Sequence, residues 1–250
     1  MTFRFAAAAV AAFALTLAGC GKSGDDAAGG PTVSASALPT VAAPAGQSWA
    51  DKVTVTPEGG YLMGNPEAPI KLVEFGALSC SHCAEFAEKS FAKLRDQYVA
   101  SGRVSYELRL FMLNAWDLPA AMLATCGAPE TVIPLSEQFW AWQPNMFNNM
   151  QAAGEAQVQA AGALPPEQRY AAMAKLTGMD AFFAERGVAA DQAKACLSDV
   201  NKASALANQT QAAADKYKVS GTPWFYLNGK DIQTVTWEAL EPMLQQAGAR

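Results

Sequence analysis

The stretch IKLVEFGALSCSHC, residues 70–83, joins a short apolar run to two cysteines that are separated by two residues. Residues 70–75 have the length and apolar character of a strand, and a turn-rich sequence precedes them. Residues 76–79 then predict a loop. A helix is expected over 81–100, because apolar residues recur there about every four positions. The cysteine pair therefore lies where a strand passes through a loop into a helix.

Cys80 precedes the predicted helix, and Cys83 lies one turn into it. The partial positive charge of the helix N-terminus stabilises a thiolate at Cys80. His82, the only histidine of the chain, lies between the cysteines, where an imidazole N–H or imidazolium adds to that stabilisation. An accessible thiol beside a partly buried one is the asymmetry that thiol–disulfide exchange requires.

A second strand and a long helical region follow. Residues 103–113 alternate apolar and polar side chains, so strand, helix and strand form the unit that builds a parallel pair. From about 114 to 218 the sequence is helical, rich in alanine and interrupted by prolines. Within it, residues 131–166 hold many large apolar side chains and few charges. Packing core is the favoured interpretation, and an apolar docking surface is the alternative.

A hairpin and a helix are expected at the C-terminal end of the chain. The pair Asn228-Gly229 favours a two-residue turn between a strand at 224–227 and a returning strand at 231–236. Residues 237–247 then predict a closing helix.

Glu74 lies six residues before Cys80, on the apolar face of the first strand. Burial there raises the pKa of a carboxyl group, which could then accept or return the proton of Cys83 during exchange. An ion pair at the strand end with Arg109 is an equally weighted alternative.

Thr222-Pro223 directly precedes the predicted strand 224–227. Proline is poorly tolerated inside central strands, and a cis peptide bond in a turn would explain its place. Thr222 would then present its backbone N–H and C=O to an extended substrate, as one rung of strand addition. A trans proline that starts an edge strand is the alternative.

Composition limits the classes of function. The chain has 250 residues, of which 51% are hydrophobic and 16% charged, with a formal net charge of −5. This length suits one domain of roughly 150–200 residues plus a processed N-terminus. No cluster of lysine and arginine tracks phosphates, so nucleic acid is not expected as a partner. No apolar run of about 18 residues follows the N-terminus, so no internal membrane span is expected.

The N-terminus predicts export. Residues 1–19 combine Arg4 with an apolar run, which is typical of a signal peptide. The segment ends in Leu17-Ala18-Gly19-Cys20, which resembles the cleavage box of bacterial lipoproteins, in which the cysteine carries lipid. A plain secretory signal is the alternative. Residues 20–48 are small and polar and predict a lipid-anchored flexible linker, so the folded domain is expected over 49–250.

These features together resemble the DsbA-like thiol–disulfide oxidoreductases of bacterial envelopes, within the thioredoxin superfamily. The resemblance covers Gly59 to the C-terminus. It implies an α/β thioredoxin fold, with a helical insertion at about 114–218 between a βαβ half and a C-terminal ββα half. The matching pieces are Met63–Pro69, Val73-Glu74-Phe75, Cys80-Ser81-His82-Cys83 and Gly221–Lys230.

The resemblance implies a role for each residue of the pair and its surroundings. Cys80 is the nucleophile and Cys83 the resolving thiol. His82 stabilises the reduced thiolate and makes the disulfide more oxidising. The remaining residues are the buried acid Glu74 and a substrate-binding surface of Thr222, Pro223 and Ser81. Ser81 stands where strongly oxidising members have proline, so the redox potential stays open.

Five cysteines leave four when Cys20 carries lipid, and an exported protein is in an oxidising compartment. The resemblance includes members with a second, structural disulfide in the helical insertion. That implies a bridge between Cys126 and Cys196. Two buried free thiols are the alternative.

The expected function is disulfide donation to exported proteins through the Cys80–Cys83 redox pair. A reductase or isomerase kept reduced by a membrane partner is the first alternative, and a Cu(I)-binding or delivery protein is the second. The expected partners are folding exported proteins and a membrane redox partner, either a quinone-linked oxidase or a thiol reductase. No metal and no cofactor beyond the redox disulfide are expected. The expected location is the periplasm, with lipid at Cys20 on a membrane surface.

Overall fold

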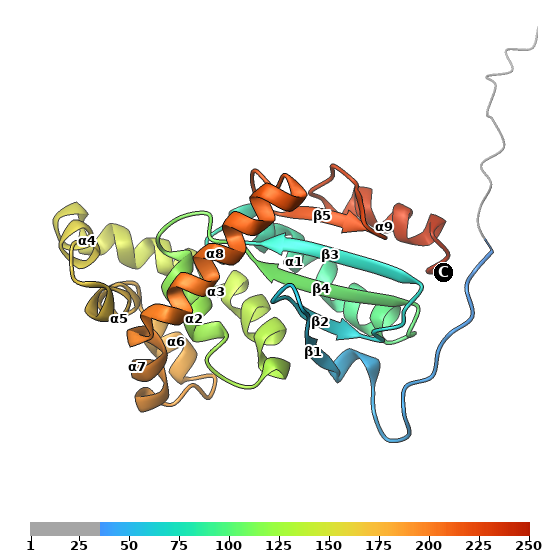
Figure 1. Ribbon diagram of the computed structural model, residues 1–250, viewed down its shortest axis with the longest axis horizontal. Helices are drawn as coiled ribbons and strands as arrows, with labels where there is room; N and C mark the ends of the chain where they lie inside the picture. The colour runs from blue at the N-terminus through green and yellow to red at the C-terminus, as the bar shows by residue number, and fades with distance from the viewer. Residues whose placement is uncertain (1–35) are drawn as a thin grey trace, which may run out of the picture. The chain divides into compact units, whose positions relative to one another are not determined.

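The structure, a computed structural model, describes residues 36–250 (Figure 1). The predicted signal segment 1–19 and Cys20 lie outside the described residues. Within the described part, none of the helices combines the length and the apolar character that crossing a membrane requires.

The centre of the fold is a sheet built from six short strands. They are β1 (Val53–Val55), β2 (Tyr61–Gly64), β3 (Ile70–Gly76), β4 (Val104–Leu110), β5 (Trp224–Leu227) and β6 (Lys230–Asp231). Their order across the sheet is β1-β2-β4-β3-β5-β6. Only the central pair β3 and β4 is parallel, as predicted, and every other neighbouring pair is antiparallel. A parallel pair requires a crossover connection, and the helix after β3 supplies it.

Helices cover both faces of this sheet. On one face lie α1 (Ser81–Lys93) and α9 (Trp237–Gln246), and the rings of Phe86 in α1 and Phe225 in β5 are 4.5 Å apart. On the opposite face lies the end of α8 (Val200–Tyr217), where the ring of Tyr217 is 5.3 Å from that of Phe75. The interior of the sheet is therefore shielded from water on both sides.

Seven helices follow β4 and precede β5, and they form the insertion. Most of them lie beyond the carboxyl ends of the parallel strands β3 and β4 (Figure 1). Besides α8, they are α2 (Asp117–Ala124), α3 (Val132–Ala153), α4 (Glu155–Gly162), α5 (Pro166–Thr177), α6 (Met179–Ala184) and α7 (Ala190–Ser198). Phe139, Trp140 and Met146 of α3 are buried, which fits the favoured interpretation of this apolar stretch as core, whereas Phe147 is 40% exposed.

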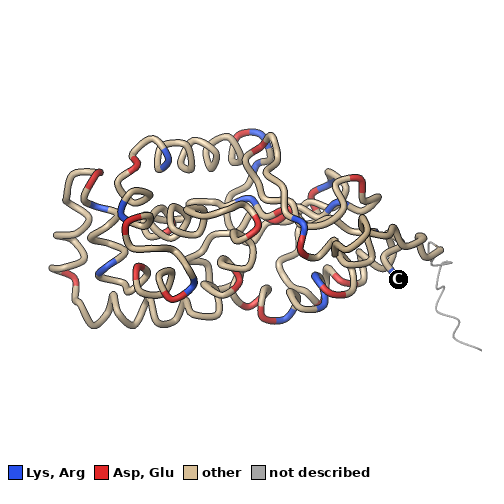
Figure 2. Tube along the Cα trace, turned by 90° about the horizontal axis from the view of Figure 1, so that it is seen from below, with Lys and Arg blue, Asp and Glu red and all other residues tan. Residues whose placement is uncertain are grey.

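Charged residues of both signs are interspersed over the helices and loops (Figure 2). Several form ion pairs between neighbouring turns, for example Lys89 with Glu85 at 2.8 Å. Exposed pairs of this kind contribute little to stability, because water and salt screen them. The apolar interior, rather than surface charge, therefore holds the fold together.

Four elements differ from the sequence prediction. The helix expected over 81–100 changes after Lys93 to a π-helical segment, Leu94–Val99. The returning strand expected at 231–236 is only two residues long, because the Asp231 side chain accepts the N–H of Gln233 and Gln233 has a positive φ of 46°. Strands β1 and β2 were not predicted, since they are only three and four residues long.

The segment ahead of the sheet contacts the domain. The N–H of Leu38 donates to the carbonyl of Gly248, and the N–H of Val41 donates to that of Ser101. Residues 36–48 were predicted as the end of a flexible linker. The contacts with the domain thus reach back to Leu38, ahead of the short 3-10 helix Trp49–Asp51.

Candidate active site

Cys80 is the N-cap residue of α1, with extended backbone angles, as a residue that ends a loop and starts a helix must have. Its Sγ accepts the backbone N–H of Cys83 at 3.3 Å, so the sulfur takes the place of the usual capping oxygen. The helix therefore directs its free N–H groups at the Cys80 sulfur.

These contacts lower the proton affinity of Cys80. Hydrogen bonding with the Cys83 thiol makes the largest contribution, and the backbone N–H groups of Cys83 and His82 add to it. Together they lower the pKa of Cys80 to about 6, although burial acts in the opposite direction. A thiol with this pKa is largely ionised at neutral pH, and the thiolate is the reactive form.

Cys83 has the opposite character. It is fully buried, and this burial, together with the hydrogen bond to Cys80 and the charge of Glu74, raises its pKa well above the ordinary value. Both cysteines are free thiols in this structure. One reactive sulfur and one protonated sulfur thus lie within a single helical turn, as expected. The predicted difference in exposure is wrong, because Cys80 is also buried, with only 6% of its surface exposed.

The peptide bond between Thr222 and Pro223 is cis, so the first of the two predicted alternatives describes this turn. The Cys80 thiol donates to the carbonyl of Thr222 at 3.1 Å. A residue 142 positions away in the sequence therefore contacts the reactive sulfur directly.

Glu74 is fully buried, and its carboxyl group faces the side of the sheet that α1 covers. The Tyr106 hydroxyl donates to Oε2 at 2.7 Å, whereas Oε1 has no hydrogen-bond partner. Burial raises the pKa of Glu74 to about 8, against the opposing effect of the Tyr106 bond. The predicted alternative, an ion pair with Arg109, is not present, because Arg109 pairs with Glu107 at 2.7 Å.

His82 and Ser81 lie on the outer surface at the start of α1. The side chain of His82 is 72% exposed, and its Nδ1 lies 3.7 Å from Glu85. Its backbone N–H is one of the groups that lower the pKa of Cys80. Ser81 is exposed and lines a groove between α1 and α3 with a volume of about 620 Å³.

Sequence reasoning missed several residues that shape this site. Tyr106 could have been found, because it lies on the same side of its strand as Val104 and Leu108 and pairs in register with Leu72. Asp117 and Gln143, which contact the loop before Cys80, carry no motif that would single them out.

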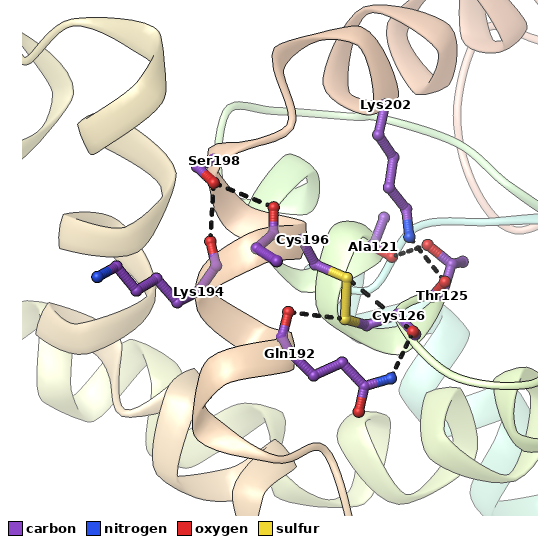
Figure 3. Close-up of a disulfide and its surroundings, with 9 residues drawn as sticks. Ala121, Thr125, Cys126, Gln192, Lys194, Cys196, Ser198 and Lys202 are labelled. Carbon is purple, nitrogen blue, oxygen red and sulfur yellow. Dashed lines mark hydrogen bonds between the residues drawn. A yellow bond between two sulfur atoms is a disulfide. The ribbon is translucent and has the colours of Figure 1, made fainter.

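Cys126 and Cys196 form a disulfide that joins the residues after α2 to α7 (Figure 3). Their Cα atoms are 5.9 Å apart, across 70 residues of sequence. Gln192 donates to the carbonyl of Cys126 at 2.8 Å, and Lys202 donates to that of Thr125 at 2.7 Å. The bridge therefore lies within the insertion, where the sequence analysis placed it.

Among residues 36–250, no group of three or more His, Cys, Asp and Glu side chains is arranged to hold a metal ion.

Comparisons with known proteins place this geometry among related chains. The family model for thioredoxin matches residues 56–246. A crystal structure of a protein-disulfide isomerase from Novosphingobium aromaticivorans has a TM-score of 0.69 and 32% identity, and the match covers 73% of this chain and 94% of that one. A structure of Wolbachia pipientis alpha-DsbA1 has a TM-score of 0.55 and 23% identity over 72% of this chain and 79% of that one, which shows a shared fold.

A curated relative from Rickettsia prowazekii is also similar, and its name, protein-disulfide oxidoreductase, is provisional. It is 22% identical over 197 residues, which cover 76% of this chain. This chain spans 62% of the length of that relative.

Proposed function

The chain belongs to the thioredoxin family, and from that premise we propose that it exchanges disulfides with exported proteins through Cys80 and Cys83. The family confirms the predicted α/β fold with a helical insertion between its two halves. The observation that carries the proposal is the contact of a low-pKa sulfur, Cys80, with the backbone carbonyl of Thr222.

In the direction of disulfide donation, the reaction begins from the Cys80–Cys83 disulfide. A substrate thiolate attacks the Cys80 sulfur, a mixed disulfide forms, and Cys83 leaves as a thiolate that takes up a proton. A second substrate thiolate then attacks the substrate sulfur of the mixed disulfide and releases Cys80 as a thiolate. Two electrons pass from the substrate to the pair, and the substrate gains one disulfide.

The surroundings of Cys80 favour this direction. A thiolate that is stabilised by the helix N-terminus is a good leaving group, and its stabilisation makes the disulfide form more oxidising. The pKa of Cys80, lowered to about 6, has this effect at neutral pH.

Glu74 supplies the proton that Cys83 requires. With its pKa raised to about 8, the carboxyl group is protonated at neutral pH. The charges of Glu74 and Cys83 affect each other across the buried side of the sheet. Glu74 can thus give its proton to the departing Cys83 thiolate and recover it when the disulfide forms again.

Thr222, Pro223 and Ser81 form the proposed substrate-binding surface. An extended substrate segment beside the cis turn would pair with the backbone of Thr222 and place its own sulfur near Cys80. Such pairing uses hydrogen bonds to the substrate backbone and does not depend on the substrate side chains. It therefore suits a protein that acts on many folding chains.

Two experiments test the proposal. The first measures the equilibrium of the Cys80–Cys83 pair against glutathione, where disulfide donation predicts a potential nearer about −120 mV than about −270 mV. The second uses Cys83→Ala, which should trap substrates as mixed disulfides through Cys80, with Cys80→Ala as the control that traps none. Failure of Cys83→Ala to trap any exported protein would contradict the exchange mechanism.

A second candidate is isomerase or reductase action by the same pair. The observation that favours it is the 32% identity to a structure described as a protein-disulfide isomerase. A thiol-reducing membrane partner would then keep Cys80 and Cys83 reduced, whereas a quinone-linked oxidase would keep them oxidised. Alkylation of the pair directly in quenched cells distinguishes the two.

The proposal places the protein in the periplasm, attached to a membrane through lipid at Cys20. The mass of the mature N-terminus tests this, since a lipidated chain begins at Cys20 and carries acyl groups. Cys20→Ser should release the protein into the soluble envelope fraction. If the mature chain carries no lipid, the prediction of membrane anchoring is wrong, whereas the prediction of export still stands.

A further inference from the structure

The loop that carries Cys80 is buried, although loops are normally solvated. Residues 76–80 are all buried, so the polar groups of their peptide bonds must find partners within the protein. The loop itself provides one bond, from the N–H of Cys80 to the carbonyl of Ala77. Side chains of the helical insertion supply most of the rest.

Gln143 of α3 contacts the loop on both sides of Ser79. Its Nε2 donates to the carbonyl of Leu78 at 2.7 Å and to that of Cys80 at 3.1 Å. The residue is 3% exposed, so water does not compete for these bonds. Trp140, one turn earlier, donates from Nε1 to the carbonyl of Ala77 at 2.9 Å. The same face of α3 therefore holds three carbonyls of the loop.

Asp117, the first residue of α2, holds the loop from a different direction. It is fully buried, and its carboxylate accepts the Ser79 N–H at 2.7 Å and the Ser79 hydroxyl at 3.0 Å. The same carboxylate accepts the N–H groups of Leu113 and Asn114 at 3.0 and 2.9 Å. One side chain thus joins the loop after β3 to the loop after β4.

We propose that Gln143 and Asp117 are positioning residues for the Cys80 sulfur. They hold the backbone on either side of Ser79, so that the sulfur stays at the N-terminus of α1 and beside the carbonyl of Thr222. Neither residue is hydrogen-bonded to the sulfur. Gln143 acts through the carbonyls of Leu78 and Cys80, and Asp117 acts through Ser79. The inference rests on the proposed function, since it concerns the same sulfur.

Hydrogen bonds to the sulfur depend steeply on distance and direction, so a small shift of the loop weakens those from Cys83 and His82. Weaker donation to the thiolate means a higher pKa for Cys80. Loss of either positioning residue should therefore move the pKa of Cys80 from about 6 toward that of an ordinary thiol.

Substitutions at the two residues separate an effect of charge on the pKa of Cys80 from an effect of loop position on it. Gln143→Met removes both donated hydrogen bonds and changes no charge, so a higher pKa of Cys80 reports position alone. Asp117→Asn removes a buried negative charge that is hydrogen-bonded to Ser79, the residue before Cys80. The loss of that charge by itself would lower the pKa of Cys80. A higher pKa in Asp117→Asn therefore also identifies a loss of position.

The measurement is the pH profile of Cys80 alkylation in the reduced protein. We expect the pKa of Cys80 to rise by about one unit in each variant. At pH 5 this rise lowers the thiolate fraction about tenfold. The more basic thiolate is also more nucleophilic, which offsets part of the loss, so the alkylation rate falls about threefold. Ser79→Ala, which removes only the hydroxyl bonds to Asp117 and Asn114, is a milder variant for the case in which the others fail to fold.

Matched controls change the same residue types at exposed positions of the helices. Gln151→Met changes an exposed glutamine of α3, and Asp199→Asn changes the exposed N-cap of α8; neither should move the profile. If Gln143→Met and Asp117→Asn lower thermal stability but keep the wild-type profile, the two residues only stabilise the fold and the inference is wrong. The readout needs no substrate protein, so it stands apart from whether the wild type transfers disulfides.

Discussion

Cys80 and Cys83 are chemically identical, yet their surroundings give them opposite proton affinities. Cys80 receives N–H groups from the helix that it caps, whereas Cys83 faces the apolar interior and the carboxyl group of Glu74. The two sulfurs, whose pKa values differ in this way, are separated by only one helical turn. At the scale of residues, the reactivity of the pair thus follows from where each sulfur lies relative to the start of α1.

Glu74 makes the stability of the reduced protein depend on pH. Its folded pKa of about 8 lies above its ordinary value of 4.5, so the folded state holds one more proton than the unfolded state between these values. The contribution of Glu74 to stability is therefore fully present below about pH 4.5 and is lost as pH rises through 8. Over this window the free energy of unfolding falls by up to about 1.4 kcal/mol per pH unit.

We predict that Glu74→Gln removes this dependence, because an amide does not titrate and still accepts the Tyr106 hydroxyl. Relative to wild type, the variant should gain about 3 kcal/mol between pH 5 and pH 7.5. Urea unfolding of the reduced proteins at several pH values measures this gain. Glu88→Gln, on the exposed side of α1, is the control and should follow the wild-type profile. Parallel profiles for Glu74→Gln and wild type would mean that Glu74 is ionised in the folded protein.

At the scale of elements, sequence patterns predicted the strands and helix ends that depend on neighbouring residues. The strand at residues 70–76 and the start of α1 at Ser81 followed from apolar spacing and the cysteine pair. The predicted strand at 231–236 failed, because one side-chain bond from Asp231 to the backbone of Gln233 ends the ladder. The contact of Gln143 with the Cys80 loop depends on how α3 packs against the sheet, which no local pattern encodes.

The disulfide between Cys126 and Cys196 constrains the helices of the insertion, so its removal should affect stability more than reactivity. Closing 70 residues of the unfolded chain stabilises the fold by about 4 kcal/mol in the chain-entropy treatment. We predict that Cys126→Ala/Cys196→Ala lowers the free energy of unfolding by up to about that amount. Denaturant unfolding measures it.

The alkylation profile of Cys80 in the same double variant is the companion measurement, and it should match that of wild type. The bridge lies at the junction of α2 and α7, and the contacts that hold the Cys80 loop come from Asp117, Trp140 and Gln143. A raised pKa of Cys80 in this variant would show that the bridge itself keeps α2 in place for the loop.

At the scale of the whole molecule, the segment from Leu38 to Trp49 ties the two ends of the described chain together. Leu38 bonds to Gly248, and Trp49 donates from Nε1 to the carbonyl of Val41 at 2.8 Å. Gly102 lies directly under this segment with a φ of +73°. A Cβ there would meet the carbonyl oxygen of Val41 and, at 2.8 Å, the Trp49 Nε1.

We therefore predict that Gly102→Ala destabilises the protein in two separable ways. The left-handed backbone angle accounts for about 1–2 kcal/mol, and displacement of the segment adds to it. Gly187→Ala is the matched control, because Gly187 also has a positive φ, of +93°, but nothing lies within 4 Å of its added Cβ. Thermal or urea unfolding of both variants measures the difference, which we expect to exceed about 1 kcal/mol.

A chain that begins at Gln47 separates the two contributions, since it lacks Leu38 and Val41 and therefore most of the contact. In that shorter chain, the effect of Gly102→Ala should fall toward that of Gly187→Ala, and the change between the two backgrounds measures the coupling of segment and domain. Equal effects of Gly102→Ala in both chains would mean that residues 38–46 are not energetically coupled to Gly102. The predicted start of the folded domain near Trp49 would then stand.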